Sequence, residues 1–413
     1  MFVNEEKIPN ALLISVDTGE FDNETSINEL SELTKTANAN VVATVIQKRP
    51  CFEKSTCIGR GRLLEVAETC KQLDVDLIIF DHELTATQVR NIEDATNVRT
   101  IDRTTLILDI FAQRARTKEG KLQVELAQQK YRLPRLAGMG VTLSRLGGGI
   151  GTRGPGETKL ETDKRHIRTR ISVLENELAE LKKHREFSRI RRKKDSVLCV
   201  AIVGYTNAGK STLINALTDS NILAEDKLFA TLDTTSRGLE LPDGRNVLIT
   251  DTVGLIRRLP HNLVEAFKST LEEASNSDLI LNVVDASSND FQEHLDVTNS
   301  LLNELGCNDI PKVTVFNKCD MCDYTNTLPL DSTHVKISAK QKVGFDNLLN
   351  AIADNLPITS RRLKAIIPYD KSNLISLVML DGKVFSQEYL PNGTLIDALV
   401  DVKVLHQIEP FKV

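Results

Sequence analysis

Apolar residues recur in the first hundred positions as short runs, and stretches with the spacing of amphipathic helices separate these runs. The apolar runs are 11–16, 41–46, 77–80 and 98–101, and the helical stretches are 26–37, 62–73 and 84–95. Strands that alternate with helices predict a parallel sheet. Because open sheets of this kind bind ligands at the carboxyl ends of their strands, Asp81 and Asp102 are candidate ligand-binding residues. An equally good interpretation makes them helix caps or turn residues.

A long helical region follows and is interrupted by a glycine-rich segment. Residues 104–133 have helical spacing with a predicted break near 118–120, and 145–157 holds too much glycine for a regular element. The next apolar positions have the spacing of a coiled-coil seam. They are Ile167, Ile171, Leu174, Leu178 and Leu181. Because this seam is short, it favours an antiparallel hairpin with the preceding helix over a dimer, and we expect a monomer.

The pattern changes again after Asp195. A continuous apolar run at 197–203 predicts a buried strand, and strands alternate with helices from there to about residue 355. The remaining residues predict a small α+β unit with strands at 364–367 and 395–405 and a helix at 372–380. The fold class is therefore α/β. The expected domains are an α/β domain (1–103), a helical hairpin arm (104–195), a second α/β domain (196–360) and a small α+β domain (361–413).

Composition and charge narrow the class of protein. The chain of 413 residues is 41% hydrophobic and 26% charged, and no apolar run is long enough to cross a bilayer. The seven cysteines are scattered and the N-terminus lacks a signal pattern, so we expect a cytoplasmic protein without a transmembrane segment. The net charge of −5 hides 22 Lys and Arg against 10 Asp and Glu between Arg114 and Asp195. Such an excess favours a polyanionic partner, although a solvated helical surface is the simpler alternative.

A glycine-rich octapeptide lies between the strand at 197–203 and a predicted helix that begins at Thr212. Its residues are Gly204, Tyr205, Thr206, Asn207, Ala208, Gly209, Lys210 and Ser211. They match the phosphate-binding loop GxxxxGK[ST] in the strand–loop–helix context that the motif requires. Glycines let backbone N–H groups point into one concavity, and the helix N-terminus adds positive potential. We expect Lys210 to reach the β- and γ-phosphates and the Ser211 hydroxyl to bind Mg²⁺.

Two short motifs further along the chain predict that the bound phosphates belong to a guanine nucleotide, so that GTP and GDP are the expected ligands. They are Asn317, Lys318, Cys319 and Asp320, and then Ser338, Ala339 and Lys340, each after an apolar strand. The Asp320 carboxylate can accept both N–H donors of the guanine edge, a pair that adenine lacks. We expect Asn317 to tie this loop to the phosphate-binding loop, the Lys318 stem to cover the base, and the Ala339 N–H to meet the guanine O6. Cys319 is then a variable position, and Cys319 and Cys322 lack the second ligand pair of a zinc site.

Two segments between these motifs are expected to sense the γ-phosphate. The first consists of Phe229, Ala230, Thr231, Leu232, Asp233, Thr234 and Thr235. The second consists of Asp251, Thr252, Val253 and Gly254. We expect Asp251 to hold Mg²⁺ through a water or through Ser211, and the Gly254 N–H to sense the γ-phosphate. Thr231 is the expected second Mg²⁺ ligand, with Thr234 and Thr235 as substitutes. Lys210, Thr231 and Gly254 are the expected catalytic residues.

Leu255 occupies the position where Ras-like enzymes carry a water-orienting glutamine. A leucine cannot orient water, so hydrolysis should depend on a partner, a monovalent cation or another residue. Asn207 is a candidate for holding K⁺ beside the phosphates, and an equally good interpretation is an amide that braces the loop.

The order of these motifs and the glycine-rich segment together resemble the HflX family of GTPases. The segment 147–161, followed by Asp163, Lys164 and Arg165, is similar to the signature of that family. The resemblance covers nearly the whole chain and is weakest before about residue 30 and after 365. One departure from the family pattern is Thr234, where many members have proline within the first switch. This could loosen the first switch, but it removes no ligand.

The resemblance implies a P-loop GTPase that binds the large ribosomal subunit and its RNA, with hydrolysis stimulated by ribosomes. It also implies that stalled or idle ribosomes are split under stress, that Ser211 and Thr231 bind Mg²⁺, and that the glycine-rich loop approaches ribosomal RNA. A peripheral membrane-associated fraction besides the cytoplasmic one is compatible with it. ATP binding by the N-terminal domain, known in the family, cannot be placed on residues here. Two alternatives stay open: a regulatory switch on a protein or membrane complex, and a GTPase subunit in RNA modification.

Overall fold

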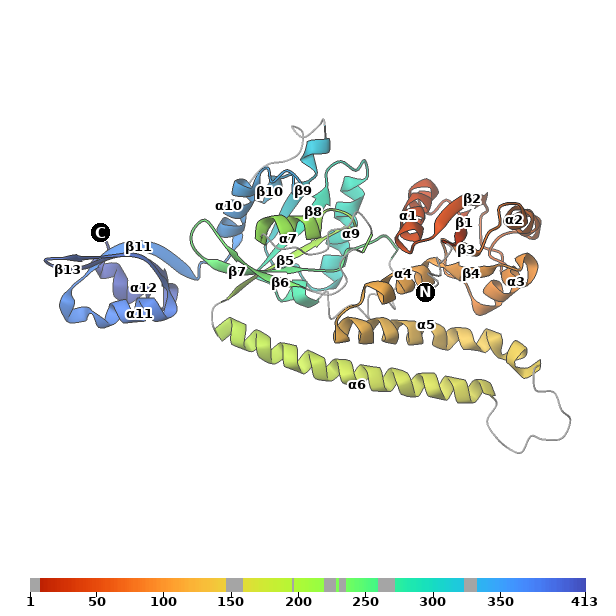
Figure 1. Ribbon diagram of the computed structural model, residues 1–413, viewed down its shortest axis with the longest axis horizontal. Helices are drawn as coiled ribbons and strands as arrows, with labels where there is room; N and C mark the ends of the chain where they lie inside the picture. The colour runs from red at the N-terminus through yellow and green to blue at the C-terminus, as the bar shows by residue number, and fades with distance from the viewer. Residues whose placement is uncertain are drawn as a thin grey trace, which may run out of the picture. The chain divides into compact units, whose positions relative to one another are not determined.

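The computed structural model describes residues 8–145, 159–194, 197–218, 228–229, 235–258, 272–322 and 333–413. These residues form two compact units. The first unit contains the described residues up to 184, together with 228–229 and Arg258. The second contains the described residues from 185 onward, apart from those three. Figure 1 shows the elements of each unit along the chain.

The first unit begins with a parallel sheet of four strands. The strands are β1 (Asn10–Asp17), β2 (Asn40–Lys48), β3 (Leu77–Phe80) and β4 (Arg99–Asp102), in the order β2-β1-β3-β4. Because β2 and β3 lie on opposite sides of β1, the strand order reverses between β1 and β3. In open α/β sheets such a reversal opens a crevice at the carboxyl ends of the strands. The predicted parallel sheet is confirmed.

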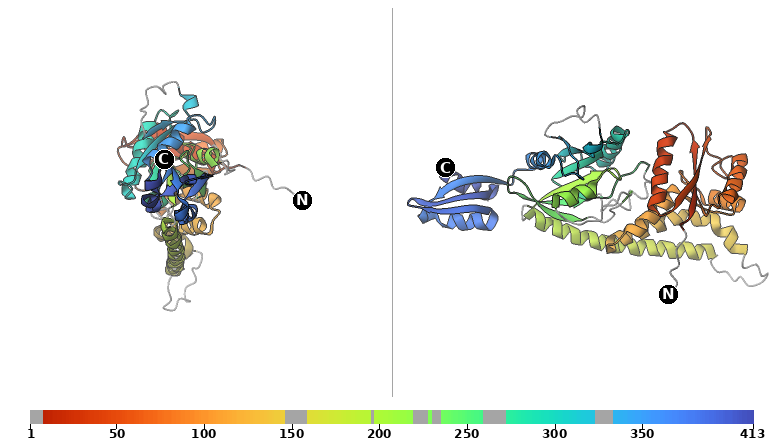
Figure 2. Two further views of the ribbon diagram at one scale, coloured as in Figure 1. Left: turned by 90° about the vertical axis from the view of Figure 1, so that its left-hand side faces the viewer. Right: turned by 45° about the horizontal axis from the view of Figure 1, so that its top comes forward.

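Four helices cover this sheet, and most of them begin at a capping side chain. They are α1 (Asn23–Thr36), α2 (Arg60–Gln72), α3 (Ala86–Thr96) and α4 (Arg103–Arg114). Figure 2 shows α1 and α2 on opposite faces of the sheet. Asp102 caps α4 by accepting a hydrogen bond from the Thr105 N–H at 2.9 Å. It also accepts hydrogen bonds from the Leu84 N–H and the Tyr131 hydroxyl, so its role is structural.

The helical hairpin consists of α5 (Lys118–Arg145) and α6 (Lys159–Lys194). Leu122 and Leu126 of α5 pack with Leu174 of α6, and the predicted seam residues Ile171, Leu178 and Leu181 pack against this cluster. Ion pairs Glu125–Arg170 and Lys130–Glu175 also join the two helices. The two helices run side by side in Figure 1, so the hairpin interpretation is confirmed. The break falls between Arg114 and Lys118, slightly before its predicted place.

The second unit is centred on a sheet of six strands that has the order β10-β9-β8-β5-β7-β6. The strands are β5 (Leu198–Gly204), β6 (Ser236–Glu240), β7 (Asn246–Asp251), β8 (Leu279–Asp285), β9 (Lys312–Asn317) and β10 (His334–Lys336). Only the pairing of β6 with β7 is antiparallel. The described helices of this α/β layer are α7 (Lys210–Thr218), α9 (Phe291–Glu304) and α10 (Phe345–Asn355). A 3-10 turn, η1 (Cys319–Met321), follows β9.

The C-terminal part is an antiparallel sheet in the order β11-β13-β12, with two helices and two short 3-10 turns. Its elements are β11 (Ser360–Ile367), η3 (Tyr369–Lys371), α11 (Asn373–Asp381), β12 (Lys383–Leu390), β13 (Gly393–Asp401), α12 (Val402–Ile408) and η4 (Glu409–Phe411). The predicted strand at 395–405 is wrong beyond Asp401, because Asp401 caps a helix there by accepting from the Lys403 N–H. The prediction missed β12, whose residues are mostly exposed. Among the described helices, none is both long and apolar enough to cross a membrane.

Candidate functional site

The phosphate-binding loop joins β5 to α7, and both of its glycines lie where no other residue fits. Gly204 has φ +149°, and a Cβ there would lie 2.2 Å from the Val283 carbonyl oxygen. Gly209 has φ +90°, and its Cβ would lie 2.3 Å from Nδ2 of Asn317. Both positions therefore require glycine for space as well as for conformation.

Lys210 is buried at the first turn of α7. Its Nζ donates hydrogen bonds to the backbone oxygens of Gly204 at 3.0 Å and Tyr205 at 2.7 Å. Burial lowers the pKa of Lys210 to about 8, and the charge of Asp251 opposes this shift. An anion beside Nζ would favour the ammonium form and reverse the effect of burial.

Asn317 connects three segments that are far apart in the chain. Its Nδ2 donates a hydrogen bond to the Ala208 carbonyl at 2.9 Å, so the expected tie to the phosphate-binding loop is present. Its Oδ1 accepts a hydrogen bond from the Ala339 N–H at 3.0 Å. The predicted contact of this N–H with the guanine O6 stays a prediction, and in the structure the N–H donates to Asn317. Asn317 is only 2% exposed, so both hydrogen bonds are shielded from water.

The other predicted base-binding residues surround Asn317. Asp320 is exposed and lies in η1, three residues after Asn317. Lys318 has a left-handed backbone (φ +61°), and its Nζ pairs with Asp285 at 2.7 Å. Cys319 donates a weak hydrogen bond from its thiol to the Phe316 carbonyl. Ser338 is buried and Lys340 is exposed, on either side of Ala339.

Asp251 and Gly254 lie against the phosphate-binding loop. The Ser211 hydroxyl donates to Oδ2 of the buried Asp251 at 3.2 Å. A Cβ on Gly254 would lie 2.8 Å from Cγ2 of Thr206 and 3.2 Å from Nζ of Lys210. Between them, Thr252 donates its hydroxyl to the Ile202 carbonyl, and Val253 is buried. Gly254 thus lies so close to the phosphate-binding loop that any side chain at this position would collide with the loop.

Leu255 is part of the scaffold. It is 3% exposed, its N–H donates to the Gly204 oxygen at 3.1 Å, and its own carbonyl accepts from the Thr206 N–H at 2.7 Å. Asn207 is exposed with φ +61°, a conformation that asparagine tolerates better than most residues. Its side chain makes no hydrogen bond within the described part of the chain, so the loop-bracing interpretation finds no support there.

Five of the residues predicted to act in the first sensing segment lie outside the described residues, namely Ala230, Thr231, Leu232, Asp233 and Thr234. Of the described residues, Phe229 is buried in the first unit, and Thr235 accepts a hydrogen bond from the Asp251 N–H. Thr212 is partly exposed on α7.

The described residues contain no group of three His, Cys, Asp or Glu side chains that could hold a metal ion. Ser211 and Asp251 nevertheless present adjacent oxygen donors, which Mg²⁺ prefers when phosphates supply further ligands. The residues therefore fit a magnesium ion bound together with a nucleotide.

A contact that sequence reasoning missed supports the loop from outside. The Tyr205 ring stacks on His294 of α9, with centroids 3.9 Å apart and planes inclined by 14°. The Tyr205 hydroxyl accepts a hydrogen bond from the Arg257 N–H at 2.8 Å. Nothing in the sequence near His294 marks it, because its partner lies almost ninety residues away in the chain.

Comparison with known proteins gives three matching family models. They are described as GTP-binding GTPase N-terminal (24–112), GTP-binding GTPase Middle Region (114–192) and 50S ribosome-binding GTPase (199–318). A GTPase HflX from Caldanaerobacter subterraneus subsp. tengcongensis is 50% identical over 401 residues, 97% of this chain and 93% of the relative. The GTPase HflX of Escherichia coli strain K12 is 41% identical over 361 residues, 86% of this chain and 85% of the relative. A crystal structure of a GTP-binding protein from Sulfolobus solfataricus in complex with GDP is 24% identical, covers 84% of this chain and 98% of that chain, and has a TM-score of 0.45.

Proposed function

Because the chain belongs to the HflX family of GTPases, we propose that it binds the large ribosomal subunit and dissociates stalled or idle ribosomes under stress. The protein hydrolyses GTP, and the family model for its G domain describes ribosome-binding GTPases. We further propose a monomer that acts in the cytoplasm, with the domain boundaries 1–103, 104–195, 196–360 and 361–413.

The observation that carries ribosome binding is the charge of the hairpin. Between Arg114 and Asp195, 22 basic residues face 10 acidic ones, although the whole chain has a net charge of −5. Exposed basic residues on α6, such as Arg165, Arg168 and Lys183, suit the phosphate backbone of ribosomal RNA. The proposed contact with RNA includes the glycine-rich segment 147–156, which lies outside the described residues.

We propose that the nucleotide occupies the site that Asn317 organises. Backbone N–H groups of 204–212 and the Nζ of Lys210 would hold the phosphates, and Asp320 would select guanine. Because Asn317 binds both Ala208 and Ala339, it fixes the phosphate-binding and base-binding loops at one spacing. This supports a single pocket for GTP.

Hydrolysis breaks the bond between the γ-phosphorus and the β–γ bridging oxygen as a water attacks, which yields GDP and phosphate. Ser211, Thr231 and, through water, Asp251 are the proposed Mg²⁺ ligands, and the ion would neutralise phosphate charge when bound. Lys210 and the Gly254 N–H would contact the γ-phosphate. Leu255 is buried on the loop and cannot position water, so a group from outside the described site must do so. The exposed Asn207 is the proposed K⁺ ligand.

Sedimentation with ribosomes tests the proposed function. The protein should comigrate with large subunits in a sucrose gradient in the presence of a non-hydrolysable GTP analogue, and much less with GDP. Deletion of 147–156 should abolish stimulation of hydrolysis by ribosomes and leave GDP binding intact. Absence from the subunit peak with either nucleotide would contradict the proposal. It would favour a regulatory switch on another complex or a GTPase subunit in RNA modification.

Potassium dependence tests Asn207 separately. Stimulated hydrolysis should be faster in K⁺ than in Na⁺, and Asn207→Ala should remove the difference. Equal rates in the two salts would exclude the K⁺ role.

A further inference from the structure

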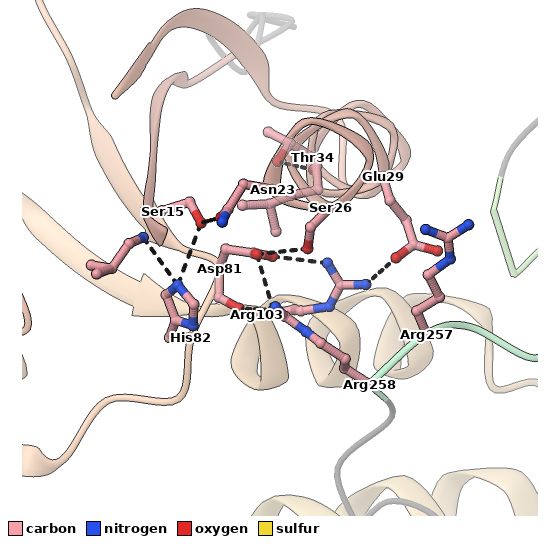
Figure 3. A network of polar contacts seen from close by, with 12 residues as sticks. Ser15, Asn23, Ser26, Glu29, Thr34, Asp81, His82, Arg103, Arg257 and Arg258 are labelled. Atoms are coloured by element: carbon pink, nitrogen blue, oxygen red, sulfur yellow. Dashed lines mark hydrogen bonds and ion pairs between the residues drawn. The ribbon is translucent and has the colours of Figure 1, made fainter. Parts of the chain in front are cut away.

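A polar cluster lies in the first unit, where the order of the N-terminal sheet reverses (Figure 3). Its centre is Asp81, which directly follows β3 and is almost completely buried. Ser26 of α1 donates its hydroxyl to Oδ2 of Asp81 at 2.7 Å, and Arg103 of α4 donates from Nη1 to Oδ1 at 3.0 Å. A third donor, Arg258, comes from a distant part of the chain. Asp81 is therefore neither a helix cap nor a plain turn residue.

Arg258 makes three kinds of contact in this cluster. Its Nη2 lies 2.9 Å from Oδ2 of Asp81 and donates to the Asp81 carbonyl oxygen at 2.5 Å. Its guanidinium carbon lies 4.1 Å from the centroid of the Phe21 ring. The side chain is 31% exposed, and the backbone has a left-handed φ of +50°. A carboxylate, a carbonyl and a ring together form a receptor shaped for a guanidinium group.

Arg258 adds a second cation beside the Asp81 carboxylate. Arg103 pairs with both Asp81 and Glu29, so Arg103 and Arg258 together match two carboxylates. His82 lies beside them, and its Nε2 accepts the Val16 N–H at 3.0 Å. The pKa of His82 is lowered to about 4, mainly by burial and in addition by the charges of Arg258 and Arg103, against the opposing charge of Asp81. His82 is thus neutral at pH 7, and its pKa is sensitive to the presence of Arg258.

Arg258 comes four residues after Gly254, which is the last residue of the segment proposed to sense the γ-phosphate. Leu255 is hydrogen-bonded to the phosphate-binding loop, and the Arg257 N–H is bonded to Tyr205. The chain from Leu255 to Arg258 can extend only about 10 Å. Only three residues separate Gly254 from Arg258, so a displacement of Gly254 should also displace Arg258.

The other sensing segment has a similar contact in the first unit. Phe229 is buried, and its ring meets that of Phe111 on α4 edge-on, with centroids 4.7 Å apart and planes at 81°. Its backbone also has a positive φ, of +53°. Phe229 of the first sensing segment and Arg258, four residues beyond the second, thus both contact the α/β layer that contains Asp81 and α4.

We propose that Asp81 and Phe21 form a docking site for the Arg258 guanidinium, and that occupancy of this site depends on whether GDP or GTP is bound. Arg258 is then a positioning residue that couples the segment after Gly254 to the N-terminal domain. This rests on the proposed role of residues 251–254 as γ-phosphate sensors. Binding of GTP draws Gly254 toward the γ-phosphate, and Arg258 leaves Asp81. Coupling is reciprocal, so docking of Arg258 weakens GTP binding relative to GDP binding.

The test uses the full-length protein and three variants. Arg258→Ala removes the guanidinium group. Arg258→Lys keeps the positive charge, but an ammonium group cannot contact the Asp81 carboxylate, the Asp81 carbonyl oxygen and the Phe21 ring at the same time. Arg90→Ala is the matched control, because Arg90 is a partly exposed arginine of the same unit whose ion pair in the described part of the chain is with Asp94, within α3. Thermal unfolding of each variant establishes that it is folded.

The first readout is the NMR titration of the His82 ring, assigned by its loss in His82→Gln. Arg258→Ala should raise the pKa of His82 from about 4 toward its ordinary value of 6.5, and Arg90→Ala should not. In the wild type, a non-hydrolysable GTP analogue should also raise the pKa of His82, and GDP should not. An identical His82 titration in wild type and Arg258→Ala, or in both nucleotide states, would overturn the proposal.

The second readout is nucleotide affinity. Arg258→Ala should bind the GTP analogue roughly fivefold tighter or more, with GDP affinity changed less than about twofold. Arg258→Lys should lie between this variant and the wild type. Equal changes for GDP and the analogue would contradict the coupling. Failure of the wild type to bind either nucleotide would instead refute the proposed GTP site, which separates the two hypotheses.

Discussion

The most informative single substitution is at Asn317, because one amide holds two loops of the proposed GTP site. Its Nδ2 donates to the Ala208 carbonyl at 2.9 Å, and its Oδ1 accepts the Ala339 N–H at 3.0 Å. Asn317→Ala removes both hydrogen bonds and leaves a buried acceptor and a buried donor without partners. Each such loss costs about 1–3 kcal/mol, so at least about 2 kcal/mol is removed from the arrangement that binds nucleotide. This corresponds to a GDP affinity lower by roughly 30-fold or more.

Asn317→Asp separates hydrogen-bond chemistry from side-chain size. The aspartate keeps an oxygen that accepts the Ala339 N–H, but its other oxygen replaces the Nδ2 that faces the Ala208 carbonyl. Two acceptors would then meet at about the distance of a hydrogen bond, and a charge would be buried at a position that is 2% exposed. We therefore expect the aspartate variant to bind GDP as weakly as the alanine variant, or more weakly.

The assay is titration of each variant with a fluorescent GDP analogue, accompanied by circular dichroism melting. The melting curves report whether the weakened site reflects loss of the fold. A properly folded Asn317→Asp variant that binds GDP within about threefold of the wild type would refute the reasoning, because the hydrogen bond to Ala208 would then contribute little.

Three further predictions concern charge and specificity. Asp320→Asn should shift preference from guanine toward xanthine nucleotides, which competition binding measures, and unchanged guanine preference would exclude Asp320 as the base-reading residue. Because burial lowers the pKa of Lys210 to about 8, phosphate binding should raise that pKa, and GDP binding at pH 8 should take up protons. Calorimetry in buffers of different ionisation enthalpy measures this uptake, and heat independent of the buffer would argue against it. The folded-state pKa of His82, about 4, lies below its ordinary 6.5, so below pH 6.5 the unfolded state binds more protons than the folded state. The N-terminal domain should therefore lose about 3 kcal/mol of stability between pH 6.5 and 4, and His82→Gln should flatten this decline in urea unfolding experiments. Equal pH dependence in wild type and variant would show that His82 is not responsible.

The sequence alone determined the features that rest on local chemistry. Alternating apolar runs and helical stretches predicted the parallel N-terminal sheet, because burial on both faces of a strand is visible in a short window. The spacing from Ile167 to Leu181 predicted the hairpin, and Gly204 to Ser211 identified the phosphate-binding loop. Glycine at 204 and 209 is required by close contacts, and such requirements leave a recognisable motif.

The local sequence pattern did not predict secondary structure correctly where a strand is exposed or where a capping residue starts a helix. The exposed strand β12 has no buried face to mark it, and the apolar residues after Asp401 form a helix because Asp401 caps it. The family resemblance supplied GTP hydrolysis and the ribosome as expectations, and the comparisons established the family.

Only the tertiary structure decided which polar groups meet. The motif had predicted that Asn317 binds the phosphate-binding loop, but Arg258 and Asp81 are 177 residues apart in the chain and no sequence pattern indicated their contact. The hydrogen bond from the Ala339 N–H to Asn317 was likewise not predicted from the sequence. The physical reason is that a buried polar group must find a partner, and the identity of that partner depends on which segments the packing of the sheets brings together.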